Sequence, residues 1–175
     1  MSKKYLILLG DHEVGKTSII SKYLRGEFPK EYEKTFGINN FEIKEETKKI
    51  VIYDSSAEIT ESSYGIKCLT ICDGIFVLYD STKRESFENI DNWINYIKKS
   101  NKTSPIILIG NKSDLKREIG EEEGRKKAEE LEIDFYETSA LTGENVNKVF
   151  NAMLKKVFEN DVEEEKKCCE KCNCF

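Results

Sequence analysis

A glycine-bracketed loop near the start of the chain constrains its fold most. Residues 10–17 read GDHEVGKT, which matches the pattern G-x-x-x-x-G-K-[ST]. The loop follows an apolar run at residues 3–9 and precedes a helical pattern that begins at Ser18. In such a setting the glycines let backbone N–H groups meet phosphate oxygens, and the helix N-terminus adds a positive dipole end. The pattern predicts a nucleoside triphosphate site; the alternative is a chance match.

The same phosphate-binding chemistry predicts the roles of two side chains in this loop. Lys16 would reach the β- and γ-phosphates, and Thr17 would give its hydroxyl to Mg²⁺. The nucleotide-binding residues predicted in the loop are Glu13, Val14, Gly15, Lys16, Thr17 and Ser18.

A second polar set follows a later apolar strand and predicts the choice of base. Asn111, Lys112 and Asp114 form an N-K-x-D pattern there. A carboxylate in this place can accept both N–H donors of the guanine Watson–Crick edge, which adenine does not offer. Ser139 and Ala140 follow another strand, and the Ala140 N–H could donate to guanine O6. Ligands of open α/β sheets bind outside the carboxyl ends of strands, where all these loops lie.

The hydrophobic pattern predicts an α/β protein. Strands are expected at residues 3–9, 41–45, 49–53, 74–80, 105–110 and 133–137. Uninterrupted apolar runs indicate parallel strands buried on both faces, whereas residues 41–53 read as a hairpin with an antiparallel edge strand. Thr82 to Glu85 has the form of a capping box that opens a helix carrying Phe87 and Trp93. The prediction is a three-layer fold of the P-loop NTPase type, with a six-stranded mostly parallel sheet and about five helices.

Composition limits the classes of function. A chain of 175 residues is long enough for one domain with a substantial core. A formal net charge of −5 argues against nonspecific nucleic-acid binding. No signal peptide or membrane span is expected. Residues 1–160 are expected to form the domain, and residues 161–175 a flexible cysteine-rich tail.

These motifs together make the chain resemble the Ras superfamily of small GTPases, and the Rab branch most closely. Segments that favour Rab are residues 10–11, 77–80, 84–87, 137–140 and 143–150, with the cysteine-rich end. The resemblance implies a GTP/GDP switch that uses Mg²⁺ in vesicle and membrane traffic. It also implies effector and exchange-factor partners, and a place on the cytosolic face of intracellular membranes with a soluble pool.

The resemblance assigns further residues to the nucleotide. Thr35 matches the switch I threonine that binds Mg²⁺ and meets the γ-phosphate, so the implied metal residues are Thr17, Thr35 and Asp54. Phe28 matches the aromatic residue beside the guanine, and Tyr32 the one that covers the phosphates.

Departures from the family pattern lie on the residues that support hydrolysis. The family's switch II sequence D-T-A-G-Q-E is here Asp-Ser-Ser-Ala-Glu-Ile, beginning at Asp54. Ala57 replaces a glycine that must rotate toward the γ-phosphate, and Glu58 replaces the glutamine that orients the attacking water. His12 and Glu13 add bulk and negative charge to the phosphate loop. Ala57, Glu58 and Lys16 are the predicted catalytic positions, with slowed hydrolysis as the expected outcome. Glu58 or His12 as a general base is the rival interpretation.

The C-terminus predicts lipid attachment. Cys172 and Cys174 form a C-x-C ending of the kind that Rab proteins present for two prenyl groups. Two such chains give stable anchoring, and no polybasic stretch accompanies them. The alternatives are a zinc knuckle or free thiols.

Two other classes of function stay open at this point. One is a scaffold that holds GTP without hydrolysing it and recruits partners. The other is a P-loop kinase for a small molecule, which would need an arginine-rich lid and would leave the N-K-x-D pattern unexplained.

Overall fold

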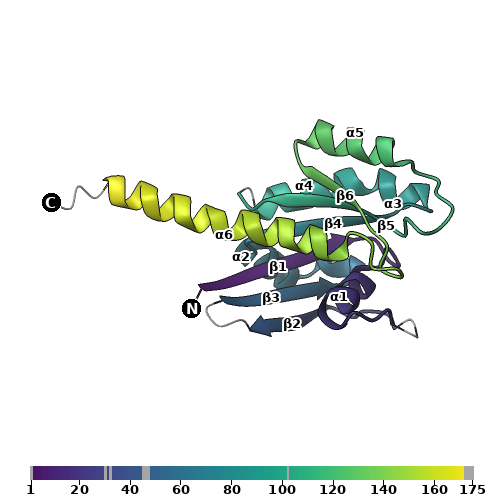
Figure 1. Cartoon of the computed structure of the whole chain (residues 1–175), viewed down its shortest axis with the longest axis horizontal. Coiled ribbons are helices and arrows are strands. Elements are labelled where there is room, and N and C mark those ends of the chain that lie inside the picture. Colours follow the sequence, from purple (N-terminus) through teal and green to yellow (C-terminus); the bar gives the residue numbers. More distant parts are fainter. Residues whose placement is uncertain (1, 30, 32, 45–47, 102, 172–175) are drawn as a thin grey trace.

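A six-stranded sheet runs through the middle of the molecule, with helices on both faces (Figure 1). The computed structural model describes residues 2–29, 31, 33–44, 48–101 and 103–171. The strands are β1 (Ser2–Gly10), β2 (Ile38–Lys44), β3 (Lys48–Ser55), β4 (Gly74–Asp80), β5 (Ile106–Asn111) and β6 (Asp134–Glu137). Their order is β2-β3-β1-β4-β5-β6. Only β2 pairs antiparallel with its neighbour, which confirms the predicted mostly parallel sheet with one antiparallel edge strand.

Both faces of the sheet are buried at its central strands, such as β4 and β5, which explains the apolar runs in the sequence. Alternate side chains of β4 enter two separate cores: Ile75 and Val77 lie in one, and Phe76 and Leu78 in the other. A strand that alternates between two cores has no face for polar residues.

The helices divide between these two cores. One face carries α1 (Lys16–Arg25) and α6 (Val146–Lys171). The other carries α2 (Ser63–Ile71), α4 (Ile90–Ser100) and α5 (Glu121–Leu131). The remaining helical elements are two short ones, the 3-10 helix η1 (Ala57–Glu61) and the helix α3 (Arg84–Glu88). On the first face the rings of Tyr23 and Phe150 stack with centroids 3.9 Å apart, which joins α1 to α6.

The predicted capping box at Thr82–Glu85 is wrong. Lys83, not Thr82, precedes the helix, and its side chain makes no capping hydrogen bond. The Thr82 hydroxyl instead donates to the buried Asp80 carboxylate at 2.7 Å, and a charged acceptor makes the stronger hydrogen bond. The expected single helix is also interrupted at Asn89, which separates α3 from α4. Taken as one bent segment, α3 and α4 complete the five helical segments expected.

The last helix continues past the body of the molecule (Figure 1). It is helical to Lys171 and so overlaps the segment predicted as a tail. Residues 172–175, which include both predicted lipidation cysteines, lie outside the described residues, and the division into domain and tail stays a prediction. Within the described part, no helix is long and apolar enough to cross a membrane.

Candidate functional site

The loop between β1 and α1 has a backbone that depends on its glycines. Gly10 and Gly15 have φ values of 141° and 96°, which L side chains rarely adopt. A Cβ on Gly15 would also lie 2.2 Å from the Asn111 side-chain nitrogen. Helix α1 begins directly after Gly15, with no side-chain cap and no acidic residue in its first turn. Its first N–H groups and its positive dipole end therefore face the loop, as an anion requires.

Lys16 lies folded across this loop. Its ammonium donates to the backbone oxygens of Gly10 and Asp11, both at 2.7 Å. The residue is only 7% exposed, and burial lowers the pKa of its amine to about 8, against the pull of Asp54 and Asp11. The Lys16 ammonium is already desolvated and lies beside a helix N-terminus, so it is suited to bind phosphate.

Three oxygen-bearing side chains meet below the loop. The Thr17 hydroxyl donates to Asp54 Oδ2 at 2.7 Å and lies 3.0 Å from the Thr35 hydroxyl. Asp54 is fully buried, its Oδ1 has no hydrogen-bond partner among the described residues, and burial raises the pKa of its carboxyl. An orphaned carboxylate oxygen beside two hydroxyls fits a hard cation such as Mg²⁺.

This cluster has few protein ligands for a metal. The described residues contain no group of three or more His, Cys, Asp or Glu side chains arranged to hold an ion. Mg²⁺ usually binds through one or two carboxylates, with substrate phosphates and waters as its remaining ligands. The cluster therefore fits a cation that takes its remaining ligands from a nucleotide and water.

Asn111 connects the loops at the other end of the site. Its side-chain nitrogen donates to the Val14 carbonyl at 2.9 Å, and its oxygen accepts from Thr138 Oγ1 at 3.1 Å and from the Ala140 N–H at 3.2 Å. The Ala140 N–H predicted for guanine O6 thus already has a partner, at a distance near the limit for a hydrogen bond.

The exposed Asp114 is held at the rim of the same region. Its carboxylate accepts from the Ser139 hydroxyl at 2.5 Å, and Ser139 Oγ accepts from the Thr142 N–H. The structure therefore brings together the residues that the sequence assigned to the base, Asn111, Asp114, Ser139 and Ala140.

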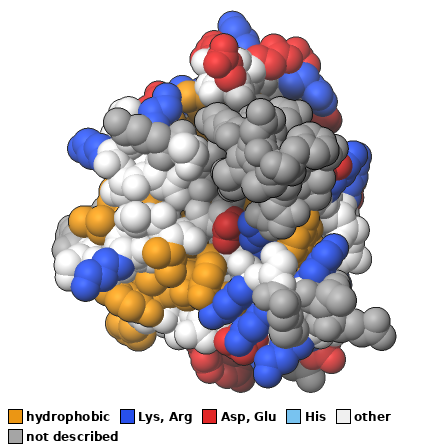
Figure 2. Space-filling view, turned by 90° about the vertical axis from the view of Figure 1, so that its left-hand side faces the viewer, with side chains coloured by type: hydrophobic (Ala, Val, Ile, Leu, Met, Phe, Trp, Pro, Cys, Tyr) orange, Lys and Arg blue, Asp and Glu red, His pale blue; other side chains and the backbone are white. Residues whose placement is uncertain are grey.

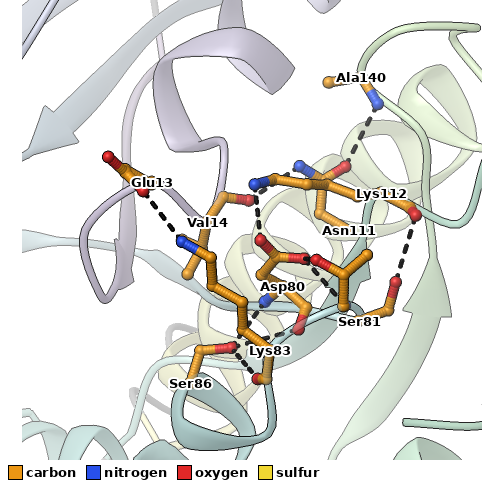
Figure 3. Close-up of polar contacts among 10 residues, drawn as sticks. Glu13, Val14, Asp80, Ser81, Lys83, Ser86, Asn111, Lys112 and Ala140 are labelled. Carbon is orange, nitrogen blue, oxygen red and sulfur yellow. Dashed lines mark hydrogen bonds and ion pairs between the residues drawn. The ribbon is translucent and has the colours of Figure 1, made fainter. Parts of the chain in front are cut away.

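Lys112 pairs with a residue that sequence analysis missed. Its ammonium lies 2.6 Å from Oδ2 of Asp80, a carboxylate buried at the end of β4 (Figure 3). Burial alone would raise the pKa of Asp80, but hydrogen bonds from Lys112 and Thr82 outweigh it and lower that pKa. An acidic residue closing an otherwise apolar strand, beside the N-K-x-D loop, was the signal available in the sequence.

Switch II meets two other segments through Glu58. Glu58 Oε1 lies 3.1 Å from the Lys34 ammonium and 3.4 Å from His12 Nε2, with all three side chains about half exposed. The hydrogen bond from Lys34 lowers the pKa of Glu58. The sequence analysis did not identify Lys34 as a site residue, although it directly precedes the predicted metal residue Thr35. Phe28 is 43% exposed, and Tyr32 lies outside the described residues.

Asp11 anchors the phosphate loop to α4, a contact also missed from the sequence. Its carboxylate accepts from Trp93 Nε1 at 2.8 Å and from the Asn89 side-chain nitrogen at 3.0 Å. Asp11, His12, Glu13, Glu58 and Lys83 also line a pocket of about 540 Å³ between the loop, η1 and α4.

Comparison with known proteins identifies the family. Residues 5–159 match the model described as Ras family. The chain belongs to the Ras family. It is 35% identical over 164 residues to Ras-related protein RABA6b of Arabidopsis thaliana, covering 87% of this chain and 70% of that protein. It is 32% identical to Ras-related protein Rab2BV of Beta vulgaris, and 30% identical to Ras-related protein Rab11C of Lotus japonicus. Each of these two matches spans 160 residues and 87% of this chain, with 75% and 74% of the relatives covered.

Membership gives the site its general meaning. This Ras-family chain is a small GTPase of the Rab branch and a GTP-binding switch, and the family implies guanine nucleotide and Mg²⁺. The small-molecule kinase alternative is thereby removed. The roles of individual residues stay predictions.

Proposed function

We propose that this Ras-family switch binds GTP with Mg²⁺, hydrolyses it slowly, and acts at intracellular membranes in vesicle traffic. The observation that carries slow hydrolysis is the place of Glu58. It follows Asp54 at the spacing of the family's glutamine, and its carboxylate is paired with Lys34 and lies 3.4 Å from His12 Nε2.

Binding of the nucleotide is supported by the whole site. Lys16 and the N–H groups at the start of α1 would hold the phosphates, and Asp114 with the Ala140 N–H would read guanine. Thr17, Thr35 and Asp54 would hold Mg²⁺, which when bound neutralises developing phosphate charge. Glu13, Val14, Gly15, Ser18, Phe28, Tyr32, Asn111, Lys112 and Ser139 complete the proposed nucleotide site.

Hydrolysis is disfavoured because the water-orienting group has the wrong chemistry. A glutamine donates and accepts hydrogen bonds at once, whereas the Glu58 carboxylate only accepts. The Ala57 Cβ restricts the rotation that would bring its N–H toward the γ-phosphate. His12 occupies space beside Glu58 that a water-orienting side chain would need. Loss of one such transition-state donor typically lowers the rate by about 10²–10³.

A general-base role for Glu58 is less well supported. The ammonium of Lys34 lowers the pKa of Glu58, which makes its carboxylate a weaker base. A complete block of hydrolysis, which would make the chain a GTP-bound scaffold, differs from slow hydrolysis only in rate.

Single-turnover hydrolysis tests the proposal. The triple variant His12→Gly, Ala57→Gly, Glu58→Gln should hydrolyse bound GTP faster than the wild type by at least about tenfold, because orientation and charge stabilisation supply nearly all catalysis in phosphoryl transfer. Glu58→Gln alone should do less. A wild type as fast as the triple variant would overturn slow hydrolysis and leave an ordinary GTPase.

Membrane attachment is proposed to depend on lipid. Cys172 and Cys174 would carry two prenyl groups. Figure 2 looks at the side of the molecule toward which α6 projects. Among the side chains coloured by type in this view, basic and acidic ones are interspersed, and hydrophobic ones are gathered to the left. A surface of mixed charge gives little electrostatic attraction to anionic lipid, so the lipid chains must supply the affinity.

Partner binding is supported by exposed apolar side chains on the switch segments. Phe36 is 76% exposed next to switch I, and Tyr64, Ile66 and Ile71 are exposed on α2. Exposed hydrophobic side chains mark protein interaction sites where they form a contiguous patch. We propose that effectors and exchange factors bind there.

A further inference from the structure

Glu13 places an acidic side chain inside a loop that must hold phosphates. Its backbone has a φ of 60°, in the left-handed region that residues other than glycine rarely adopt. A free carboxylate three residues from Lys16 would repel a nucleotide triphosphate. The Glu13 carboxylate therefore opposes phosphate binding by this loop unless its charge is compensated.

Lys83 lies against this carboxylate. Its ammonium is 2.9 Å from Glu13 Oε2, although the two residues are 70 positions apart in the chain. Figure 3 shows the pair spanning from the phosphate loop to the turn after β4. The hydrogen bond from Lys83 also lowers the pKa of Glu13, which keeps the carboxylate ionised and paired.

The turn that carries Lys83 is held in place by backbone contacts. The Lys83 N–H donates to the Asp80 carbonyl at 3.0 Å. The Ser86 hydroxyl donates to the Lys83 carbonyl at 2.8 Å and accepts from the Asp80 N–H at 3.0 Å. The ammonium thus extends from a fixed turn at the end of a buried strand, which limits the entropy lost in forming the pair.

We propose that Lys83 is a charge-compensating residue of the nucleotide site, which neutralises Glu13 so that the phosphate loop retains its nucleotide. This inference rests on the proposed binding of GTP or GDP at that loop. Lys83 acts through Glu13 and is a positioning residue, not a catalytic one.

Release of a fluorescent GDP analogue tests the assignment. Lys83→Ala should speed release about three- to tenfold, a range that allows for the screening of a half-exposed pair. Lys83→Arg should restore the wild-type rate. The acceleration should also shrink in 1 M salt, where the Debye length is about 3 Å.

Glu13→Gln separates compensation from a direct effect on the phosphates. In a Glu13→Gln background, Lys83→Ala should change the release rate far less than it does beside Glu13. An equal acceleration in both backgrounds would show that Lys83 acts on the nucleotide directly and would overturn the assignment.

Lys156→Ala is the matched control. Lys156 pairs with Asp134 at the same distance, 2.9 Å, and with comparable exposure, but on α6 and β6. Its removal should leave the release rate unchanged. A wild type that binds no guanine nucleotide would overturn the proposed function, and the inference with it. A wild type that binds nucleotide, with Lys83→Ala releasing it at the wild-type rate, would overturn the inference alone.

Discussion

At the scale of single residues, the site contains groups suited to hold phosphate and a cation, and also acidic groups that oppose nucleotide binding or hydrolysis. Lys16, Thr17 and Asp54 lie where phosphate and a hard cation would be held. Glu13 and Glu58 add negative charge to the same region, and each is paired with a lysine from another segment. The acidic departures are therefore accommodated electrostatically, although pairing does not give Glu58 the donor that a glutamine has.

Base recognition gives the first residue-scale prediction. Asp114→Asn places an amide donor where guanine also presents donors, so GTP affinity should fall by at least about tenfold and xanthosine nucleotides should gain. Competition binding of the two nucleotides measures the change. Asp134→Asn, at the opposite end of β6 from the base loop and paired with Lys156, should have no effect. A wild type that binds ATP as tightly as GTP would contradict the assignment.

Lys16 gives a pH-dependent prediction. With a pKa near 8, its amine loses charge as the pH rises above that value, and bound phosphates would raise the pKa again. Binding above pH 8 must then take up a proton, so affinity should fall by up to about tenfold per pH unit. Nucleotide titrations between pH 7 and 9 measure this, and a flat profile would exclude it.

The stability of the nucleotide-free protein should change in the opposite direction. The unfolded chain keeps Lys16 protonated to higher pH, because burial lowers the pKa of this amine only in the folded state. The Lys16 contribution to the free energy of unfolding should therefore rise with pH above 8. Denaturant unfolding curves at the same pH values would show that any loss of nucleotide affinity does not come from unfolding of the protein.

At the scale of elements, two helices decide the shape of the phosphate loop. Helix α1 supplies the N–H groups, while α4 holds the loop through Asp11, whose carboxylate accepts from Trp93 and Asn89. The loop is thus fixed on one side by its own helix and on the other by a helix more than 70 residues later.

The α4 contact gives the element-scale prediction. Trp93→Phe keeps an aromatic ring in the core but removes the hydrogen bond to a charged acceptor, so the free energy of unfolding should fall by about 1–2 kcal/mol. Urea denaturation measures it. Tyr96→Phe is the matched control on the same helix, because the buried Tyr96 hydroxyl has no hydrogen-bond partner among the described residues. An equal loss in both variants would show that Asp11 gains nothing from Trp93.

At the scale of the whole molecule, the sheet gathers the functional loops at one edge and α6 leads away from it. The loops after β1, β3, β4, β5 and β6 all follow the carboxyl ends of strands, which is where ligands of open α/β sheets bind. The C-terminal helix projects from the body instead, so lipid at its end would leave the nucleotide site accessible (Figure 1).

The tail gives the molecule-scale prediction. Replacing Cys172 and Cys174 by serine should move the protein from membranes to the cytosol, because neither prenyl chain could then attach. Cell fractionation measures the shift, and nucleotide binding should be unchanged. Replacing Cys68 and Cys72, which are buried and lie outside the tail, should not shift the distribution between membranes and cytosol. Cell-derived protein without a prenyl adduct on any tail cysteine would exclude this anchor.

The sequence by itself determined the layers and the strand types, and it predicted the residues of the phosphate and base loops. These follow from local signals: glycine spacing sets a loop, and an apolar run such as residues 75–79 demands a strand buried on both faces. The N-K-x-D pattern is a weak signal alone, and it predicts base recognition only together with the phosphate loop and residues 137–140 at other strand ends.

Tertiary structure alone decided which charges meet. Nothing local indicates that Lys83 reaches Glu13, that Lys34 reaches Glu58, or that Trp93 holds Asp11, because each pair is brought together by the crossing of separate elements. The capping box failed for a different, local reason: the carboxylate of Asp80, only two residues earlier, accepts from the Thr82 hydroxyl. Electrostatic pairing depends on distance in space, and only the packed sheet and helices set that distance.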